Sequence, residues 1–458
     1  MKRRLLLFTL LLAVALNCGR GLRSGGSSGS GGADGGGSGG GDGGSDGDGG
    51  DGNLGATISI SPTSGTRMMR PTITGSGFTS NVSVTLGGAP CTNVNVVSET
   101  EISCYAGPHS PGSVDVVVTQ GSASATLPSG FQYKSYLYVS VAGSNSIKNF
   151  EISSLGGLSE LGAMAVGNVP TEIIIPSLSP FLFVLNTGDF SITAFGLSTS
   201  GTLVTLSSGT SSVPVAGEFA VNAIGSLLYQ ADTQTGTNDV ESYHFNDSTG
   251  ELTLIDADGV GKGGTNARLT PLGDSVYVSL SDGTKSMSGF QTGSNGLLTT
   301  QPNSPYFDSI GTGDLAISND GKFIYQVDTD FGLIRPYARD AASGDLVHQS
   351  TFSAGSISIL LTVHPTQPCL YVLDNVDNSG FILNWDPSTG ELTTLASSTF
   401  STGSAPNTIA FDPGASFAFI TNGSSGNVSS YSVGNDCKLT SLGSPTPVGT
   451  GPHGAATF

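Results

Sequence analysis

The sequence predicts an all-β chain in which a β-sandwich is followed by a seven-bladed β-propeller. Of the 458 residues, 68 are Gly and 22 are Pro, whereas only five are Met and one is Trp. This composition favours short strands joined by turns over helices. Residues 56–134 hold short alternating runs separated by Gly and Pro, and residues 135–458 hold a strand-like run that recurs seven times. A repeat of this kind is the sequence signature of a propeller.

The charge balance limits the classes of partner. The chain has 16 Lys and Arg against 35 Asp and Glu, and its formal net charge is −19. Such a chain does not attract a phosphate backbone through its overall field. We therefore expect no nucleic-acid partner.

The first 17 residues have the pattern of a signal peptide. Basic residues at positions 2–4 precede an apolar run over residues 5–16. Twelve residues are too few to cross a bilayer core of about 30 Å, so this run is typical of a signal-peptide core. The sequence predicts export.

The run ends in Ala15-Leu16-Asn17-Cys18, which resembles a bacterial lipobox, although Ala15 and Asn17 depart from the usual residues. The resemblance implies lipidation of Cys18, a membrane partner through this lipid, and a location at the outer membrane or cell surface. The alternative is an ordinary secretory signal in which Cys18 has no role.

Residues 18–55 are expected to form a disordered tether. Positions 25–52 contain 17 Gly, five Ser, five Asp and one Ala. No side chain in this stretch can contribute to a core, so it cannot offset the entropy lost on folding. Export, lipidation and the tether together predict folded domains that a flexible linker joins to a membrane anchor.

The segment 56–134 predicts a β-sandwich because alternating runs recur between Gly and Pro turns every 8–12 residues. Its ordered motifs are Gly75-Ser-Gly-Phe78, Gly87-Gly-Ala-Pro-Cys91, Ile102-Ser-Cys104 and Gly130-Phe-Gln-Tyr133. Together they resemble an IPT/TIG immunoglobulin-like (Ig-like) domain, which implies a structural or interaction module. Cys91 and Cys104 lie 13 positions apart in a chain expected to be exported, and we predict a disulfide between them.

The remaining chain, 135–458, divides into seven units of four strands. The second strands begin at Tyr136, Phe181, Leu227, Ser275, Phe323, Cys369 and Phe417, with spacings of 45, 46, 48, 48, 46 and 48 residues. A Gly-x-Leu pair precedes the last strand in most units. The first unit lacks an innermost strand, and residues 451–458 align with residues 405–411, so the C-terminal strand is expected to close the ring and remove the open edge.

These repeats resemble the lactonase-type (6-phosphogluconolactonase-like) propellers and the related YVTN repeats. Cys369 begins a second strand, and Cys437 lies in the turn before the outer strand of the next unit. Both turns fall on one face of a propeller, so the pair is a candidate disulfide, the alternative being two free thiols.

Polar residues are expected to converge at the channel mouth, where the innermost strands begin. Aligning these strands places three carboxylates and an amide from four consecutive blades at one level, with Arg268 close by: Glu172, Glu218, Asn266 and Asp314. Such oxygen ligands suit Ca²⁺ or Mg²⁺, which makes either ion a candidate cofactor. In the other interpretation these side chains hydrogen-bond neighbouring strands or water, with Arg268 as the counter-ion.

The sequence favours a binding protein over an enzyme. His453 matches a Pro-His often seen at a strand start in lactonase-type propellers, and with Arg268 it forms the candidate catalytic pair. Lactonases of this type carry more His, Arg and Glu around the channel mouth than this sequence does. We therefore expect an exported, lipid-anchored scaffold whose propeller face binds a protein or small-molecule ligand. The alternative is a lactonase-like hydrolase with a metal-assisted site.

Two further interpretations concern the propeller surface. A glycan-binding adhesin is a third functional hypothesis, but a chain with one Trp offers sugars few stacking surfaces. Arg335 and Arg339 flank a Pro-Tyr pair on a second strand and are expected to be solvated.

Overall fold

The computed structural model describes residues 54–213, 217–233, 238–259, 261, 263–281, 285–306, 313–354 and 360–458. The predicted signal peptide, Cys18 and the tether up to residue 53 lie outside this part of the chain. The described residues form strands and one 3₁₀ turn, η1 (Ala142–Ser144), which confirms the all-β prediction. None of the described segments forms a helix long and apolar enough to cross a membrane.

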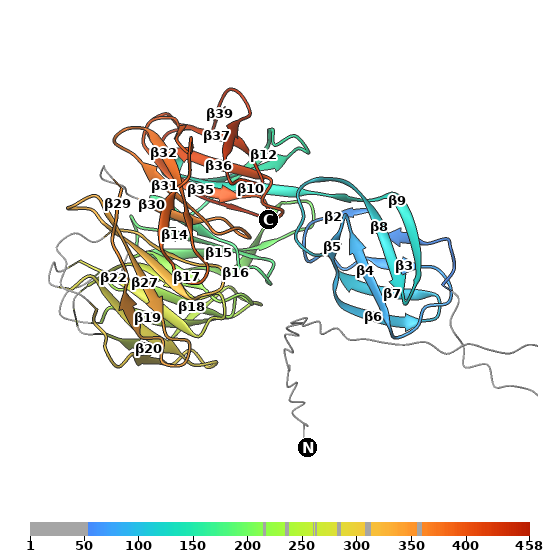
Figure 1. The fold of residues 1–458 in the computed structure, drawn as a ribbon, viewed down its shortest axis with the longest axis horizontal. Helices are drawn as coiled ribbons and strands as arrows, with labels where there is room; N and C mark the ends of the chain where they lie inside the picture. The colour runs from blue at the N-terminus through green and yellow to red at the C-terminus, as the bar shows by residue number, and fades with distance from the viewer. Residues whose placement is uncertain are drawn as a thin grey trace, which may run out of the picture. The chain divides into compact units, whose positions relative to one another are not determined.

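The first domain is a sandwich of two sheets (Figure 1). One sheet has the order β1 (Ser59–Ser61), β3 (Thr72–Thr74), β7 (Glu101–Tyr105) and β6 (Thr92–Ser98). The other has the order β2 (Ser64–Gly65), β9 (Ala123–Tyr133), β8 (Gly112–Gln120), β4 (Val82–Leu86) and β5 (Ala89–Pro90). Their inner faces bury one core that includes Ile73, Val118 and Phe131. The predicted sandwich is confirmed.

The sandwich begins two residues before the predicted boundary at residue 56. Leu54 packs into its core, and the Gly55 amide donates to the Ser76 carbonyl at 2.8 Å. The folded domain therefore includes Leu54, the last apolar residue before the predicted boundary.

The predicted disulfide between Cys91 and Cys104 is not formed in the structure, where both residues are thiols. The Cys91 thiol is hydrogen-bonded to Cys104, which raises the pKa of Cys91. The strand register pairs Thr92 with Tyr105, so the two cysteines are offset along the sheet rather than directly opposed. The two cysteines are therefore in contact, as their spacing of 13 residues suggested, but they do not lie directly opposite each other on the two strands.

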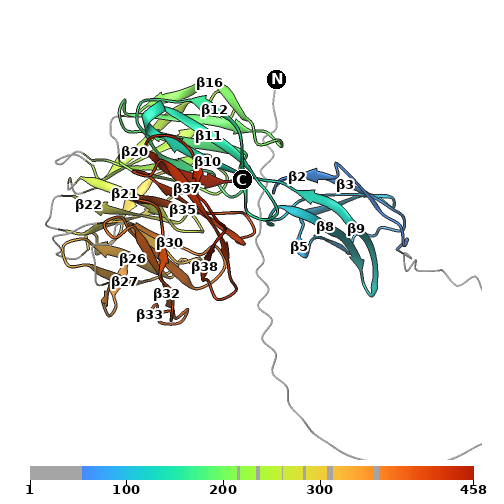
Figure 2. The same ribbon diagram turned by 90° about the horizontal axis from the view of Figure 1, so that it is seen from above.

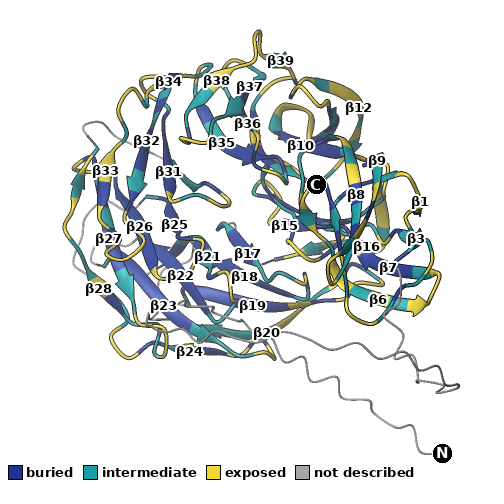
Figure 3. Ribbon diagram, turned by 45° about the vertical axis from the view of Figure 1, so that its right-hand side comes forward, coloured by how far each residue is buried: buried dark blue, intermediate teal, exposed yellow. Residues whose placement is uncertain are grey.

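The second domain is a propeller of seven four-stranded antiparallel blades, as predicted. Figure 3 views it close to its axis, with innermost strands such as β17, β21, β25 and β35 near the centre and outer strands at the periphery. The blades are, from the inner strand outwards: blade 1, β40 (Pro452–Thr457), β10 (Ser135–Val141), β11 (Ser146–Ile152), β12 (Leu158–Ala165); blade 2, β13 (Pro170–Ile174), β14 (Phe181–Asn186), β15 (Ser191–Leu197), β16 (Leu203–Ser212); blade 3, β17 (Phe219–Val221), β18 (Leu227–Ala231), β19 (Val240–Phe245), β20 (Leu252–Asp258); blade 4, β21 (Gly264–Leu269), β22 (Ser275–Leu280), β23 (Met287–Thr292), β24 (Leu298–Thr300).

The last three blades carry one extra short strand each. They are blade 5, β25 (Leu315–Ile317), β26 (Phe323–Asp328), β27 (Leu333–Arg339), β28 (Leu346–His348), with β29 (Phe352–Ser353); blade 6, β30 (Leu360–Val363), β31 (Cys369–Asp374), β32 (Ser379–Trp385), β33 (Leu392–Thr394), with β34 (Phe400–Ser401); blade 7, β35 (Pro406–Phe411), β36 (Phe417–Asn422), β37 (Asn427–Val433), β38 (Leu439–Ser441), with β39 (Thr446–Pro447). Each extra strand pairs with the third strand of its own blade.

The ring closes through the C-terminal strand, as predicted. β40 pairs antiparallel with β10, with Ala456 opposite Tyr138, and Figures 1 and 2 both place the C-terminus beside β10. The Phe458 amide and carbonyl also bond Tyr136 at 2.9 and 2.8 Å. Residues from the two ends of the domain therefore share one blade, which leaves no open inner edge.

A tight turn between the third and fourth strands links each blade to its neighbour. Its positive-φ residue is Gly156, Gly201, Gly250, Gly296, Gly344, Gly390 or Cys437, in blade order. The carbonyl of this residue accepts a hydrogen bond from a second-strand tyrosine of the preceding blade in several cases. Tyr138 donates to Gly201 at 2.9 Å, and Tyr371 donates to Cys437 at 2.6 Å.

The candidate disulfide between Cys369 and Cys437 is confirmed, with a Cα–Cα distance of 6.5 Å. Cys437 occupies the turn position that is Gly in the other six blades. The disulfide therefore joins blades 6 and 7 at the place where the other blades make the turn contact.

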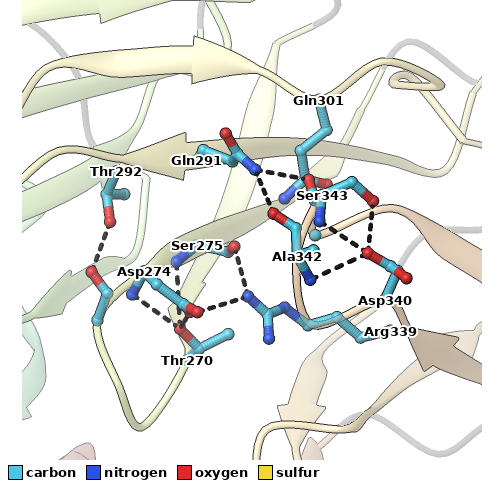
Figure 4. A network of polar contacts seen from close by, with 12 residues as sticks. Thr270, Asp274, Ser275, Gln291, Thr292, Gln301, Arg339, Asp340, Ala342 and Ser343 are labelled. Carbon is cyan, nitrogen blue, oxygen red and sulfur yellow. Dashed lines mark hydrogen bonds and ion pairs between the residues drawn. The ribbon is translucent and has the colours of Figure 1, made fainter.

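Arg335 and Arg339 are not solvated as expected. Arg335 pairs with Asp328 across β26 and β27. The Arg339 side chain is only 6% exposed and reaches from blade 5 to Asp274 of blade 4 at 2.8 Å. It also donates to Ser275 Oγ at 2.9 Å and to the Tyr277 hydroxyl at 3.1 Å, within the inter-blade network of Figure 4. The long arginine side chain spans the seam between two blades, which a position in one strand does not reveal.

Candidate functional site

A cavity of about 650 Å³ lies at the channel mouth of the propeller. All six residues predicted for the site line it: Glu172, Glu218, Asn266, Arg268, Asp314 and His453. They come from the innermost strands, or the residues just before them, of blades 1 to 5. The predicted site residues therefore converge on one cavity, as the alignment of the innermost strands suggested.

β-Bulges set the direction of several of these side chains. Pro170 lies opposite Asn186 and Glu172 lies opposite Leu185, so Thr171 has no partner of its own. The same irregularity occurs in β35 after Pro406, in β21 before Ala267, and in β40 after Pro452. A bulge redirects the following side chain and is frequent beside functional sites. Proline is tolerated beside such a bulge because it has no N–H group to donate to the neighbouring strand.

Arg268 lies at the centre of the acidic wall. Its guanidinium is 2.8 Å from Glu218 Oε2, 2.8 Å from Asp314 Oδ1 and 3.7 Å from Glu172 Oε1. It also donates to the carbonyls of Ala267 and Leu315, at 3.1 and 3.2 Å. Four of the five N–H bonds of this arginine are therefore committed to protein acceptors.

Backbone amides of the next blade hold the carboxylates in place. Glu172 Oε2 accepts from the Phe219 amide at 3.0 Å, and Asp314 Oδ2 accepts from the Leu361 amide at 2.9 Å. Asn266 Nδ2 donates to Glu218 Oε2 at 2.9 Å. The acidic wall thus connects blades 2 to 6, and these backbone donors are partners that the sequence alone did not reveal.

Burial changes the protonation of the wall. Burial raises the pKa of Glu172 well above its ordinary value, and the Glu218 charge raises it further, while Arg268 opposes both. Burial also raises the pKa of Asp314 to about 6, against the effect of Arg268. Burial alone would lower the pKa of Arg268, but Asp314, Glu218 and Glu172 raise it. The surroundings of Glu172 therefore favour its protonated form, while the three carboxyl groups favour the charged form of Arg268.

His453 lies at the exposed side of the cavity. Its Nδ1 is 2.8 Å from the Thr171 carbonyl, which can only accept a hydrogen bond, so Nδ1 carries the proton. In the neutral ring this leaves the Nε2 lone pair to accept a proton or a hydrogen bond. The side chain is exposed, so a molecule in the cavity can reach this nitrogen.

The predicted metal ligands do not form a metal site in this arrangement. Glu172, Glu218 and Asp314 surround a guanidinium, and Asn266 presents its amide nitrogen to Glu218. Within the described ranges, no group of three His, Cys, Asp or Glu side chains could hold a metal ion. Ca²⁺ needs six to eight oxygens, whereas here Arg268 already pairs with one oxygen of Glu218 and one of Asp314. The hydrogen-bonding interpretation, with Arg268 as counter-ion, fits the structure.

The opposite side of the cavity carries no charged side chain among the described residues. Leu360, Thr408 and Gly454 continue the level of Glu172 around the ring, and Ile317 and Val363 also line the cavity. The cavity is therefore divided into an acidic half and an uncharged half.

Comparisons with known proteins agree with this architecture. Residues 57–134 match the IPT/TIG domain model, and residues 351–456 match the model of the lactonase, 7-bladed β-propeller. No curated protein matches the chain significantly.

Solved structures are similar in fold. A periplasmic gluconolactonase from Pseudomonas aeruginosa has 18% identity and a TM-score of 0.61, over 71% of this chain and 99% of that one. A protein from Lactobacillus plantarum has 19% identity and a TM-score of 0.61, over 71% and 99%. A Bacteroides fragilis protein whose name suggests 6-phosphogluconolactonase activity has 17% identity and a TM-score of 0.60, over 71% and 98%. At these identities the similarity shows the fold, and the chain therefore combines an IPT/TIG domain with a lactonase-type seven-bladed β-propeller.

Proposed function

We propose that the propeller is a ligand-binding domain and that the chain acts as an exported scaffold, anchored by a lipid on Cys18. The observation that carries the proposal is the cavity of about 650 Å³. Its volume lies in the range of small-molecule sites, and few such cavities occur in a protein. Polar groups converge on one side of it, while the other side can accommodate an apolar part.

Binding is tested by blocking the cavity. A fragment library is screened by ligand-observed NMR against the wild type, Leu360→Trp and Leu155→Trp. Leu360 lines the cavity, whereas Leu155 is 80% exposed in a turn of blade 1. We expect ligands that bind the wild type and Leu155→Trp but not Leu360→Trp. The same ligand set on all three proteins would contradict the proposal.

The lipid anchor is tested separately. Cells expressing the full chain are labelled with an alkyne palmitate, and the wild type is compared with Cys18→Ala. Label on the wild type alone supports lipidation at Cys18. An unlabelled wild type that is still exported would support the ordinary secretory signal instead.

Lactone hydrolysis is the second candidate, favoured by three groups in one cavity. Arg268 would polarise the lactone carbonyl through its remaining N–H. His453 Nε2 would take a proton from the attacking water, and protonated Glu172 would give a proton to the ring oxygen as the C–O bond breaks. A general acid or base of this kind contributes about 10²–10⁴-fold to a rate.

The enzyme candidate is tested with δ-gluconolactone. Hydrolysis above the uncatalysed rate, reduced about 100-fold in His453→Gln and unchanged in His244→Gln, would favour an enzyme. His244 is an exposed residue of blade 3 outside this cavity. An uncatalysed rate with the wild type would contradict the assignment for this substrate.

A further inference from the structure

The hydrogen-bonding capacity of the cavity is dominated by acceptors. Among the described residues, Glu218 Oε1 has no hydrogen-bond partner, because Asn266 and Arg268 both bond Oε2. Glu172 Oε1 is 3.7 Å from Arg268, beyond hydrogen-bond distance. The Nε2 atom of His453 adds a third acceptor at the exposed side. A bound molecule therefore meets an acidic wall that needs hydrogen-bond donors.

The same wall offers little to an anion. Arg268 is the one Arg or Lys among the described residues that line the cavity. Four of its five N–H groups already donate to Ala267, Leu315, Glu218 and Asp314. The wall has three carboxyl groups against one guanidinium, so its net charge stays negative even when one of the carboxyl groups is protonated. A phosphate or carboxylate would be repelled by this wall and would find no free pair of donors.

The uncharged half suits a hydrocarbon group. Leu360 and Val363 of β30 line this part of the cavity. Leu360 stands at the level of Glu172 and Glu218, on a different side of the ring. A molecule with a donor-rich cation at one end and an apolar group at the other would satisfy both halves.

We infer that the cavity binds small organic ammonium ions, with the ammonium group on Glu218 and Glu172 and the hydrocarbon part against Leu360 and Val363. This inference rests on the proposed ligand-binding function and names the class of ligand. An ammonium ion needs only two or three acceptors, whereas Ca²⁺ needs six to eight oxygens. For this reason the acidic wall suits an ammonium although Arg268 prevents a metal site.

Three probes that share a 2-phenylethyl group and differ in charge test the inference. They are 2-phenylethylammonium, 2-phenylethanol and 3-phenylpropanoate, titrated into the full-length protein at pH 7.5 by calorimetry. We expect the ammonium to bind at least tenfold more tightly than the alcohol, and the carboxylate not to bind. Glu218→Gln should bring the ammonium within threefold of the alcohol, because the amide keeps the shape but removes the charge.

Two matched variants accompany Glu218→Gln. Glu160→Gln changes a carboxylate on β12 that pairs with Lys148 at 3.0 Å, and it should keep the full preference. Glu172→Gln serves as the second wall variant if Glu218→Gln does not fold, and it should reduce ammonium binding.

The outcomes separate this inference from the proposal on which it rests. Equal affinities for ammonium and alcohol, both lost in Leu360→Trp, would overturn the ammonium assignment and leave ligand binding intact. Ammonium binding that survives both wall variants would place the site elsewhere and also overturn it. Binding of none of the three probes would contradict the inference, while the fragment screen tests ligand binding independently.

Discussion

Glu172 shows how one buried carboxyl can be held in place without a full opposite charge. A backbone amide bonds one oxygen, and the nearest cationic group is 3.7 Å from the other. Burial and the neighbouring Glu218 then favour the protonated form. The protonated carboxyl can donate or accept a hydrogen bond, and the ionised one can only accept, so Glu172 suits both proposed functions.

We predict that Glu172→Gln changes the pH dependence of stability. The pKa of Glu172 is higher in the folded than in the unfolded protein, so the folded state binds the extra proton. The free energy of unfolding of the wild type therefore falls as pH rises from the ordinary glutamate value through the raised one. The slope is about 1.4 kcal/mol per pH unit across this window. Glutamine does not ionise and should lack this part of the fall.

Urea denaturation at pH 4 and pH 8 measures the effect. The variant should gain stability relative to the wild type between the two pH values. A difference between the proteins that does not change with pH would show that the Glu172 pKa is not raised.

We predict that removing the charge of Arg268 lowers the free energy of unfolding. Arg268→Met removes the cation that faces Glu218 and Asp314 at 2.8 Å and leaves the buried Asp314 carboxylate without its partner. Breaking such a pair costs about 3 kcal/mol or more. We expect this loss at pH 7 in urea denaturation, and a smaller loss at pH 4, below the raised pKa of Asp314 of about 6. Lys438→Met, in an exposed pair with Asp436, should cost less than about 1 kcal/mol.

Calcium should have no effect on the wild type. Arg268 already pairs with one oxygen each of Glu218 and Asp314, so millimolar Ca²⁺ is expected to leave the melting temperature unchanged in differential scanning fluorimetry. A calcium-dependent rise that EDTA reverses would restore the metal hypothesis.

At the scale of elements, the contact between neighbouring blades repeats along the ring. At five of the seven seams, a side chain at the start of a second strand packs on the turn glycine of the next blade. A Cβ built on Gly201 would lie 2.3 Å from the Tyr136 ring, and one on Gly390 would lie 2.3 Å from the Phe323 ring. Cys369 and Cys437 hold the equivalent positions in blades 6 and 7, where a disulfide replaces the ring-on-glycine contact.

This equivalence predicts that an aromatic–glycine pair can replace the disulfide. Cys369→Ser with Cys437→Ser should lose about 2–4 kcal/mol of stability, as is usual when a disulfide is removed. Cys369→Phe with Cys437→Gly should recover a large part of this loss and should be insensitive to dithiothreitol. Thermal unfolding with and without the reductant compares the variants. A Phe/Gly protein no more stable than the Ser/Ser protein would show that the contacts are not equivalent.

The elements also show which features a sequence can reveal. Strand order, blade number and the closing strand followed from a repeat of fixed length, because each blade must bury the same kind of surface. Cys437-Lys438-Leu439 stands where other units have Gly-x-Leu, so this disulfide was also within reach. The acidic wall was found because its residues share one register, but the bonds from Glu172 and Asp314 to backbone amides depend on the exact approach of the next blade.

Contacts between two strands of uncertain register were less accessible. The position of Cys91 relative to Cys104 depends on register shifts in the pairing of β6 with β7, and the spacing of the two residues in the sequence does not determine these shifts. Arg339 crosses a seam between blades, and its partner Asp274 is 65 positions away along the sequence. Both cases turn on side-chain reach rather than on pattern.

At the scale of the whole propeller, the strand that closes the ring also contributes a residue to the site. β40 supplies His453 to the cavity and the inner strand to blade 1. Gly454 follows His453 and packs directly against the first strand of blade 2. A Cβ at this position would lie 2.6 Å from the Thr171 carbonyl and 2.9 Å from Glu172 Cα. Glycine is required there because the two backbones meet with no room for a side chain.

We therefore predict that Gly454→Ala destabilises the propeller by about 1–3 kcal/mol, the usual cost of overpacking. Neither the Thr171 backbone nor that of Glu172 can move without shifting the cavity wall, so ligand binding should weaken as well. Gly162→Ala is the matched control, because β12 is an outer strand and the nearest atom to its new Cβ is Asn149 Oδ1 at 3.7 Å. Urea denaturation of both variants measures the difference. Equal stabilities would show that the closing strand can move away from blade 2 at no cost, and that the ring is less tightly closed than this contact implies.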